Sequence, residues 1–341
     1  MLGIETIFMT FCALSSAKGM DIKMKHFYFA SCTSDGGVYH YIWKNRELQF
    51  LEKWGCDCPM YLLIEGKRMW ILLRQPFKET PESGVVTCLL DRKGRIKENG
   101  EAISSEGLVA CHLCSYCGKI YVANYSSGSI FCTDGTLRSH IGSGPNTKRQ
   151  EMPHIHFISP APDNACILAT DLGTDQIYSY SATLERIGSA GVPAGYGPRH
   201  LAFSADGNTV FCVNELDSSV SVFRYERGEL HLLETVSVLK RKNSENLSAA
   251  IRVGGKYVYV SNRGNDSISC LEWDGTHLCL RNEISCGGNS PRDFILEDGK
   301  IFCANEQSGT VTILDVDGLQ IRLTERHLDI PGVLCVAVYE A

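Results

Sequence analysis

Several features that would identify common classes of protein are missing from this chain. Its 341 residues contain no uninterrupted apolar run of roughly 18 residues, so we expect no membrane-spanning helix. Long basic runs are also missing, and the formal net charge is −6, which argues against a nucleic acid as partner. The one basic cluster, Lys240-Arg241-Lys242, is typical of a solvated loop.

Motifs of several enzyme classes are absent as well. The chain has no Gly-x-Ser-x-Gly motif, no P-loop and no dinucleotide fingerprint. Cys111, Cys114 and Cys117 have the spacing of iron–sulfur ligands, but Tyr121 stands where the fourth ligand is expected. The Cys-x-Cys pair before Pro59 has no second ligand pair. We therefore expect neither a metal nor another cofactor.

Cysteine itself is abundant, with sixteen residues. Many of them stand where a strand would carry Val, Ala or Ser, as in Phe211-Cys-Val and Phe302-Cys-Ala. Free cysteine packs as a small hydrophobic residue, whereas a secreted chain would use cysteine for disulfides. The pattern favours buried, unpaired thiols in a reducing cytoplasm.

Residues 1–24 precede the first predicted strand and match no repeat. Residues 7–14 are apolar and faintly resemble a signal peptide, but no basic segment precedes them. Met20 and Met24 are alternative starts. We expect an extension, disordered or wrongly assigned as coding, followed by one domain over residues 25–341.

A module recurs seven times at intervals of 42 to 50 residues. Each copy has a short polar segment, usually opening with Asn, between two alternating apolar runs. Clear copies start at Asn124, Asp171, Asn214, Asn262 and Asn305, and weaker ones at Cys32 and near Arg74, where an insertion stretches the module. A strand-rich repeat of this length predicts an all-β, seven-bladed propeller with one four-stranded antiparallel blade per repeat.

The fifth repeat gives the clearest blade. Its strands are predicted over residues 200–204, 209–214, 220–225 and 230–239, with turns between them. Residues 26–31 resemble a second strand of a blade, because the first motif follows them directly. Residues 333–338 at the other end of the chain should provide the missing inner strand and close the ring.

In an antiparallel blade, the start of the inner strand and the loop after the second strand lie on the same face. Residues that follow the recurrent prolines and the recurrent Asn should therefore surround one mouth of the channel. These positions vary in type while their neighbours do not. They hold Met60, His154, Arg199, Arg292, Gly332, Tyr125, Leu172, Glu215, Arg263 and Glu306. The sequence predicts a polar cleft with both acids and cations.

Five short motifs, in order and spacing, resemble those of the seven-bladed lactonase family. They are Pro153-His-Ile-His156, Gly197-Pro-Arg-His200, Val213-Asn-Glu-Leu216, Ser261-Asn-Arg263 and Pro291-Arg-Asp293. The family includes propeller-type 6-phosphogluconolactonases and the fungal 3-carboxy-cis,cis-muconate lactonizing enzyme. The resemblance covers residues 25–341 and implies a metal-free site. Matched by motif, its catalytic residues are His154, Arg199, Glu215 and Arg263, with His156, His200, Arg292 and Glu306 as substrate-binding candidates.

Each candidate also has a structural explanation. His154 and His156 point to opposite faces of a strand, so at most one serves the cleft; the motif favours His154. Arg199 and Arg263 could bind a phosphate or carboxylate, or form structural ion pairs. Glu215 could act as a base or cap a turn, whereas the Asn residues recur too regularly to be catalytic.

The resemblance implies hydrolysis of a sugar-acid lactone, phosphorylated or not, by water addition to the ring carbonyl. Glu215 or His154 would be the base and an arginine would stabilise the oxyanion. One alternative is a cycloisomerase that closes a lactone; another is a noncatalytic scaffold, although the Trp-Asp and Gly-His signatures of such repeats are absent in register. We expect a small anionic lactone as ligand and a monomer or weak homodimer.

Overall fold

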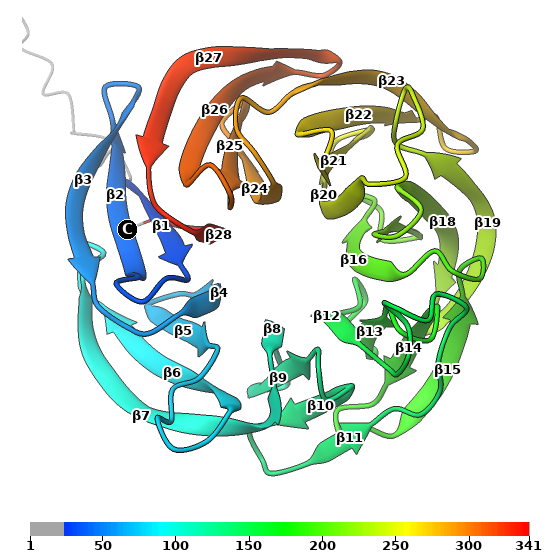
Figure 1. Cartoon of the computed structure of the whole chain (residues 1–341), viewed down its shortest axis with the longest axis horizontal. Helices are drawn as coiled ribbons and strands as arrows, with labels where there is room; N and C mark the ends of the chain where they lie inside the picture. Colours follow the sequence, from blue (N-terminus) through cyan, green and yellow to red (C-terminus); the bar gives the residue numbers. More distant parts are fainter. Residues whose placement is uncertain (1–23, 341) are drawn as a thin grey trace, which may run out of the picture.

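The computed structural model describes residues 24–340, which form a ring of seven four-stranded antiparallel sheets (Figure 1). Residues 1–23, which make up nearly all of the predicted N-terminal extension, and Ala341 lie outside the described residues. Within the described region, no helix has the length and apolar character needed to cross a membrane. The predicted seven-bladed propeller is confirmed.

Each blade runs from an inner strand at the channel to an outer strand at the rim. Blade one contains β28 (Val333–Glu340), β1 (Lys25–Ser31), β2 (Gly37–Lys44) and β3 (Glu47–Trp54). Blade two contains β4 (Pro59–Glu65), β5 (Arg68–Leu73), β6 (Glu82–Leu90) and β7 (Ile96–Leu108). Blade three contains β8 (Ala110–Tyr116), β9 (Lys119–Asn124), β10 (Ser129–Cys132) and β11 (Leu137–Ser139). Blade four contains β12 (Ile155–Pro160), β13 (Ile167–Asp171), β14 (Gln176–Tyr180) and β15 (Arg186–Gly191).

The remaining three blades follow the same order. Blade five contains β16 (Pro198–Phe203), β17 (Thr209–Asn214), β18 (Ser219–Glu226) and β19 (Glu229–Ser237). Blade six contains β20 (Leu247–Gly254), β21 (Tyr257–Arg263), β22 (Ser267–Trp273) and β23 (Leu278–Ser285). Blade seven contains β24 (Pro291–Glu297), β25 (Lys300–Asn305), β26 (Thr310–Asp317) and β27 (Gln320–Asp329). The predicted strands of the fifth repeat agree with blade five to within two residues at each end.

The two ends of the chain meet in blade one, as the sequence predicted. β28 pairs antiparallel with β1, with Phe27 opposite Val338 and Phe29 opposite Val336. Figure 1 shows the red C-terminal strand beside the blue N-terminal one. Because β28 is the inner strand of blade one, the end of the chain covers one edge of β1 and closes the ring.

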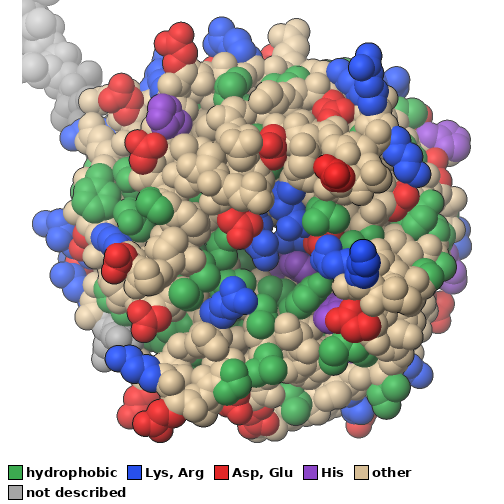
Figure 2. Space-filling model, viewed as in Figure 1, with side chains coloured by type: hydrophobic (Ala, Val, Ile, Leu, Met, Phe, Trp, Pro, Cys, Tyr) green, Lys and Arg blue, Asp and Glu red, His purple; other side chains and the backbone are tan. Residues whose placement is uncertain are grey.

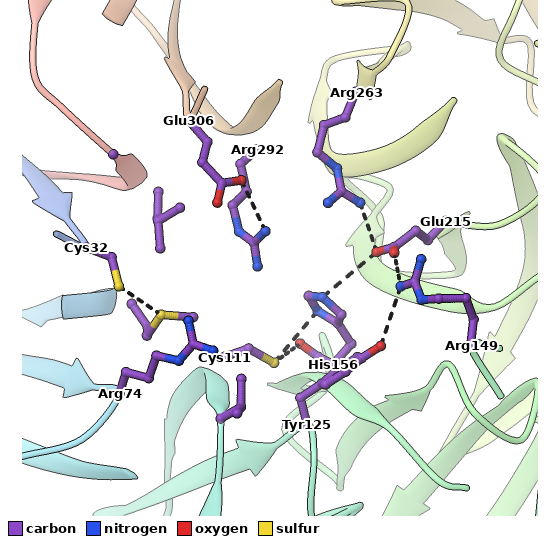
Figure 3. Close-up of a pocket in the computed structure, with 14 residues that line it drawn as sticks. Cys32, Arg74, Cys111, Tyr125, Arg149, His156, Glu215, Arg263, Arg292 and Glu306 are labelled. Atoms are coloured by element: carbon purple, nitrogen blue, oxygen red, sulfur yellow. Dashed lines mark hydrogen bonds and ion pairs between the residues drawn. The ribbon is translucent and has the colours of Figure 1, made fainter. Parts of the chain in front are cut away.

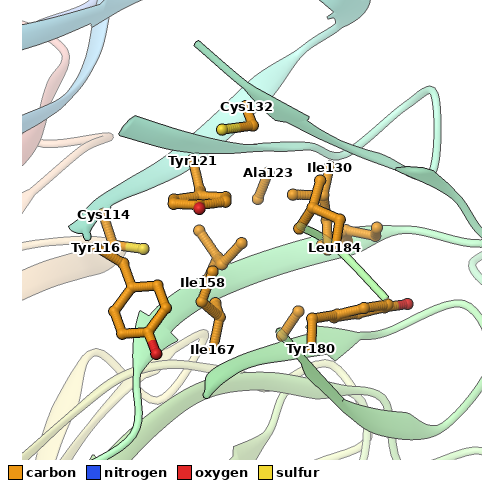
Figure 4. Packing of buried hydrophobic residues seen from close by; sticks show 12 residues of the cluster. Cys114, Tyr116, Tyr121, Ala123, Ile130, Cys132, Ile158, Ile167, Tyr180 and Leu184 are labelled. Carbon is orange, nitrogen blue, oxygen red and sulfur yellow. The ribbon is translucent and has the colours of Figure 1, made fainter. Parts of the chain in front are cut away.

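The core lies between neighbouring blades, because alternate side chains of each strand point to its two faces. Between blades three and four, Tyr121 and Ile130 pack with Ile158, Ile167 and others in one buried cluster (Figure 4). Each fully buried side chain of this size stabilises the fold by roughly 1.5–3 kcal/mol. Packing therefore runs around the whole ring and fixes the blades that carry the site.

Candidate functional site

In six of the seven blades, a bulge near the start of the inner strand turns one side chain toward the channel. In β16, Pro198 pairs with Asn214 and His200 with Val213, which leaves Arg199 as the extra residue. A bulge of this kind re-aims a side chain. The corresponding extra residues in the other five one-residue bulges are Met60, Cys111, His156, Arg292 and Leu334. All six side chains line the channel.

A second ring of residues comes from the end of each second strand. The recurrent Asn, or the residue that stands in its place, is the last paired residue of the second strand. The residue after it faces the channel. Six of these seven residues line one cavity: Cys32, Arg74, Tyr125, Glu215, Arg263 and Glu306. The seventh, Leu172, is fully buried elsewhere. The predicted convergence of the strand ends on one mouth is therefore correct for most positions.

The two rings enclose a central cavity of about 300 Å³. Figure 2 shows cationic and histidine side chains around the hollow at the middle of this face. A smaller cavity of about 20 Å³ lies among Arg199, His200, Asp293 and five residues that also line the larger one. Four arginines and two glutamates line the central cavity, an excess of two positive charges in an acidic protein.

The charged side chains of the site surround Glu215, which is only 2% exposed. Three guanidinium groups hold its carboxylate, and we call these four residues the Glu215 cluster. Arg199 Nε lies 2.9 Å from Oε2 and Arg263 Nη2 lies 3.0 Å from the same oxygen. Arg149 Nη2 donates to Oε1 at 2.5 Å. Figure 3 shows Glu215 between Arg263 and Arg149 on one side of the cavity.

Burial alone would raise the pKa of Glu215, but the charges of Arg263, Arg199 and other nearby cations hold it well below its usual range. Burial lowers the pKa of Arg199 to about 9, so its guanidinium still carries a proton at neutral pH. The pair is thus fully ionised inside the protein. Its charges are satisfied by close contacts, as buried charges require.

Arg199 lines only the smaller cavity, and its Nε and Nη1 are engaged by protein groups. Besides Glu215, its Nη1 donates to the carbonyl of Ala249 at 2.7 Å and lies 3.1 Å from His200 Nε2. Arg263 differs, because it lines the central cavity and its Nε makes only a long contact, 3.3 Å, with the carbonyl of Leu247. Arg199 can therefore position Glu215, whereas Arg263 can also reach a ligand.

His156, not His154, is the histidine of the central cavity. His156 Nε2 lies 4.0 Å from Glu215 Oε2, and its Nδ1 lies 3.8 Å from Cys111 Sγ. Burial and the charge of Arg199 lower the pKa of His156 well below its ordinary value, so the ring is neutral. His200 lies beneath it, with the ring centroids 5.3 Å apart, and lines only the smaller cavity.

The placement of His154 in the cleft is wrong, and the strand register explains the error. Ile155 pairs with Asp171 in the way that Pro198 pairs with Asn214, so the bulge falls on His156. Pro153 thus stands two residues earlier in its blade than Pro198 does. His154 lines neither cavity; its ring stacks on Tyr125 and its Nδ1 lies 3.1 Å from the Tyr125 carbonyl.

The other two candidates lie on a different side of the cavity. Arg292 Nη1 lies 3.3 Å from Glu306 Oε2, and both residues line the cavity. The sequence predicted that acids and cations meet at one mouth of the channel. The residues that do so are Arg199, Glu215, Arg263, Arg292, Glu306 and His156. Gly332, also predicted for the rim, lines the cavity as well.

Several lining residues were not identified as candidates from the sequence, among them Arg149, Cys111 and Arg74. Arg149 lies in the loop between β11 and β12, outside the repeat, so no repeat position marked it. Cys111 was assigned only to a strand, yet it occupies the same bulge position as Arg199. Arg74 follows Leu73, which stands where other blades have Asn. The one sign of Arg74 in the sequence was that blade two lacks the Asn of the repeat at the preceding position.

The recurrent Asn residues are structural, as expected. Asn214 is fully buried, and its Nδ2 donates to Ser219 Oγ at 3.0 Å and to Ser221 Oγ at 2.9 Å. Asn262 makes the same pair of bonds, to Ser267 and Ser269. Each Asn therefore ties the second strand of its blade to the third, directly behind the residue that faces the cavity.

The three cysteines with iron–sulfur spacing do not converge. Cys111 lines the cavity, Cys114 belongs to the core between blades three and four, and Cys117 is exposed in the turn after β8. Of the fifteen cysteines in the described region, nine are buried. This agrees with the prediction that most strand cysteines serve as core residues.

A seven-bladed ring with a charged central cavity defines the class of this protein, and comparison identifies the family. The chain belongs to the family described as "Lactonase, 7-bladed beta-propeller", which matches residues 26–338. Among individual relatives, a 6-phosphogluconolactonase from Bacillus subtilis (strain 168) is 32% identical over 241 residues, covering 64% of this chain and 69% of that protein. The suspected resemblance is confirmed.

Solved structures agree with this assignment. A proposed 6-phosphogluconolactonase from Bacteroides fragilis NCTC 9343 superposes with a TM-score of 0.85 at 25% identity, covering 94% of this chain and 99% of that one. A periplasmic gluconolactonase from Pseudomonas aeruginosa gives a TM-score of 0.82 at 22% identity, covering 92% and 99%. The second similarity concerns the fold alone.

Proposed function

We propose that this protein hydrolyses a sugar-acid lactone and that 6-phosphogluconolactone is its leading substrate. The observation that carries the proposal is the excess of arginine in the central cavity, gathered around the buried, ionised Glu215. An acidic protein with a cationic cavity selects a small anion from solution. Family membership and the similarity to the Bacillus subtilis 6-phosphogluconolactonase support the same substrate class.

The reaction would be addition of water to the ring carbonyl. Arg263, which faces the cavity, would donate to the carbonyl oxygen and stabilise the negative charge that develops there. Glu215 is a poor base, because three guanidinium groups stabilise its ionised form. Its proposed role is electrostatic, holding Arg199 and Arg263 in place beside the reacting atoms.

We assign the proton transfer to His156, because its ring is neutral and lines the cavity, whereas three guanidinium groups engage the carboxylate of Glu215. As the water oxygen bonds to the carbonyl carbon, the water proton would pass to His156, and Glu215, 4.0 Å away, would stabilise the imidazolium. When the tetrahedral intermediate collapses, the ring C–O bond breaks and His156 would return the proton to the leaving oxygen. The products are balanced: one water is consumed and one hydroxy acid is released.

The direct test is a lactonase assay of the wild-type protein and two variants of the Glu215 cluster. Glu215→Gln keeps the shape but removes the charge that holds the arginines, and Arg199→Ala removes the residue that positions Glu215. Each should lower turnover of 6-phosphogluconolactone on the order of 100-fold or more. Arg241→Ala, a change at an exposed loop position, should leave turnover unchanged.

The thermal melting curve of each variant separates lost chemistry from lost fold. Folded variants with full lactonase activity would contradict the proposed mechanism. A wild-type protein that closes a lactone from an unsaturated diacid, and opens none, would indicate the cycloisomerase instead.

A further inference from the structure

Blade two departs from the repeat at the residue that faces the cavity. Leu73 pairs with Pro59 as Asn214 pairs with Pro198, so Arg74 occupies the position that Glu215 occupies in blade five. Residues 74–81 then form the longer loop before β6. The same structural position thus carries a negative charge in one blade and a positive charge in another.

The backbone around Arg74 is held on both sides. Its N–H donates to the carbonyl of Cys58 at 3.1 Å, and its own carbonyl accepts from Ser83 Oγ at 2.7 Å. Ser83 is fully buried and its Oγ also accepts from the N–H of Ala110. The exposed side chain of Arg74 therefore extends from a fixed anchor, and it lines the central cavity.

The cavity arginines differ in what already binds them. Arg149 and Arg263 both contact the carboxylate of Glu215 at 3.0 Å or less. Arg292 has one contact with an acid, the 3.3 Å approach to Glu306, and Arg74 has no ion pair with any acid of the described region. Figure 3 shows the guanidinium groups of Arg74 and Arg292 turned toward the middle of the cavity, with Glu215 across from them.

We propose that Arg74 and Arg292 form a phosphate-binding subsite that holds the far end of the substrate while its lactone ring lies at the Glu215 cluster. This inference rests on the proposed lactonase function. A phosphate monoester carries about −1.5 to −2 charges at neutral pH, which two guanidinium groups match. Each planar fork can donate two parallel hydrogen bonds to phosphate oxygens, which ammonium groups cannot do.

The surrounding charges determine which arginines bind the phosphate and which bind the lactone ring. A phosphate at the Glu215 cluster would meet a carboxylate whose partners are already engaged. Among the described residues, Glu306 is the one acid in contact with Arg292, and it is partly exposed and can turn toward solvent. The sulfur atoms of Cys32 and Met60, 3.6 Å apart, form a wall of the same cavity and weaken competition from water.

The inference is tested by comparing two substrates that differ only in the phosphate, 6-phosphogluconolactone and glucono-lactone. For Arg74→Ala and Arg292→Gln, the ratio of the two kcat/KM values should fall on the order of 10- to 100-fold, mainly through KM of the phosphorylated lactone. Arg74→Lys should fall between alanine and the wild type, because it keeps the charge and loses the fork. Arg241→Ala should leave the ratio unchanged.

Calorimetry with 6-phosphogluconate and with gluconate tests the subsite without any turnover. The wild type should bind 6-phosphogluconate more tightly, and Arg74→Ala should remove that difference. If the wild type opens neither lactone but this difference is present and depends on Arg74, the proposed reaction fails and the subsite stands. Equal losses for both ligands, or no loss, in variants with unchanged melting curves would overturn the subsite.

Discussion

At the scale of single residues, the contacts of each charged group decide its role in the cavity. Glu215 is surrounded by three arginines and stays ionised, so it stabilises charge better than it accepts protons. His156 beside it is neutral and faces the cavity. We therefore assign charge stabilisation to Glu215 and the proton transfer to His156.

The two histidines of blade four provide a sharp prediction at this scale. His156→Gln should lower kcat for 6-phosphogluconolactone by about 10²- to 10⁴-fold, because the proton acceptor is lost. His154→Gln should change kcat by no more than a few-fold, since its ring lines neither cavity and stacks on Tyr125. Steady-state kinetics of the two variants, with melting curves, provide the measurement. A larger loss for His154→Gln would reverse the assignment.

At the scale of strands, two devices place the residues of the site. Bulges in the inner strands of six blades each turn one side chain into the channel, and the buried Asn residues fix the second strands just before their cavity-facing residues. The bulges come from backbone pairing and the contacts of Asn214 and Asn262 from side-chain hydrogen bonds, and both stay within one blade. Each blade can therefore carry a different side chain at the same position without altering its neighbours.

Asn262 allows the second device to be tested. Asn262→Ala removes the amide that donates to Ser267 Oγ and Ser269 Oγ, 3.1 and 2.8 Å away, and leaves these groups with fewer partners in a buried site. We expect a loss of about 1–3 kcal/mol in the free energy of unfolding. Urea denaturation measures it, with Asn208→Ala in an exposed turn as the control.

If Asn262 is only structural, the folded variant should keep its affinity for the product. Any small loss of affinity would come from a shift of the neighbouring Arg263. A variant of unchanged stability that nevertheless loses turnover would assign Asn262 a chemical role.

At the scale of the whole molecule, closure of the ring holds the site together. β28 covers β1 and contributes Leu334 to the cavity and Val333 and Val336 to the core between blades one and seven. Removing residues 332–341 should expose an edge of β1 and leave the protein aggregated or unfolded. Size-exclusion chromatography and thermal melting give the readout, with removal of residues 340–341 as the control. Unchanged melting after the longer truncation would refute closure.

Buried histidines make the stability of the molecule depend on pH. Burial is the main cause that lowers the pKa of His112 to about 3 and puts those of His156 and His200 well below their ordinary value. The unfolded chain binds protons at these rings near pH 6.5 and the folded chain does not. Stability is therefore complete above pH 6.5 and falls as the pH decreases, by up to about 2 kcal/mol per histidine between about pH 7 and pH 5.

Urea midpoints measured across this pH range test the sign and the cause. His112→Phe should flatten the decrease, because the ring already packs between Tyr61 and Phe157 and the variant cannot bind a proton. His231→Gln, at an exposed position, should leave the slope unchanged. Stability that increases toward pH 5 would contradict the burial of neutral rings.

The sequence by itself determined the number of blades, the closure and most of the rim. The repeated Asn positions and alternating apolar runs are local patterns, and antiparallel strands necessarily bring their ends to one face. Glu215, Arg263 and Glu306 could be placed from these rules alone, since each directly follows a recurrent Asn.

Only the tertiary structure decided which side chains meet. The bulge at His156 depends on pairing between β12 and β13, and the two-residue offset of Pro153 cannot be read from the residues before it. Arg149 reaches Glu215 from a loop that no repeat describes, 66 residues away in the chain. Such contacts depend on register and on long-range approach, because hydrogen bonds between strands, rather than local sequence, fix where each side chain points.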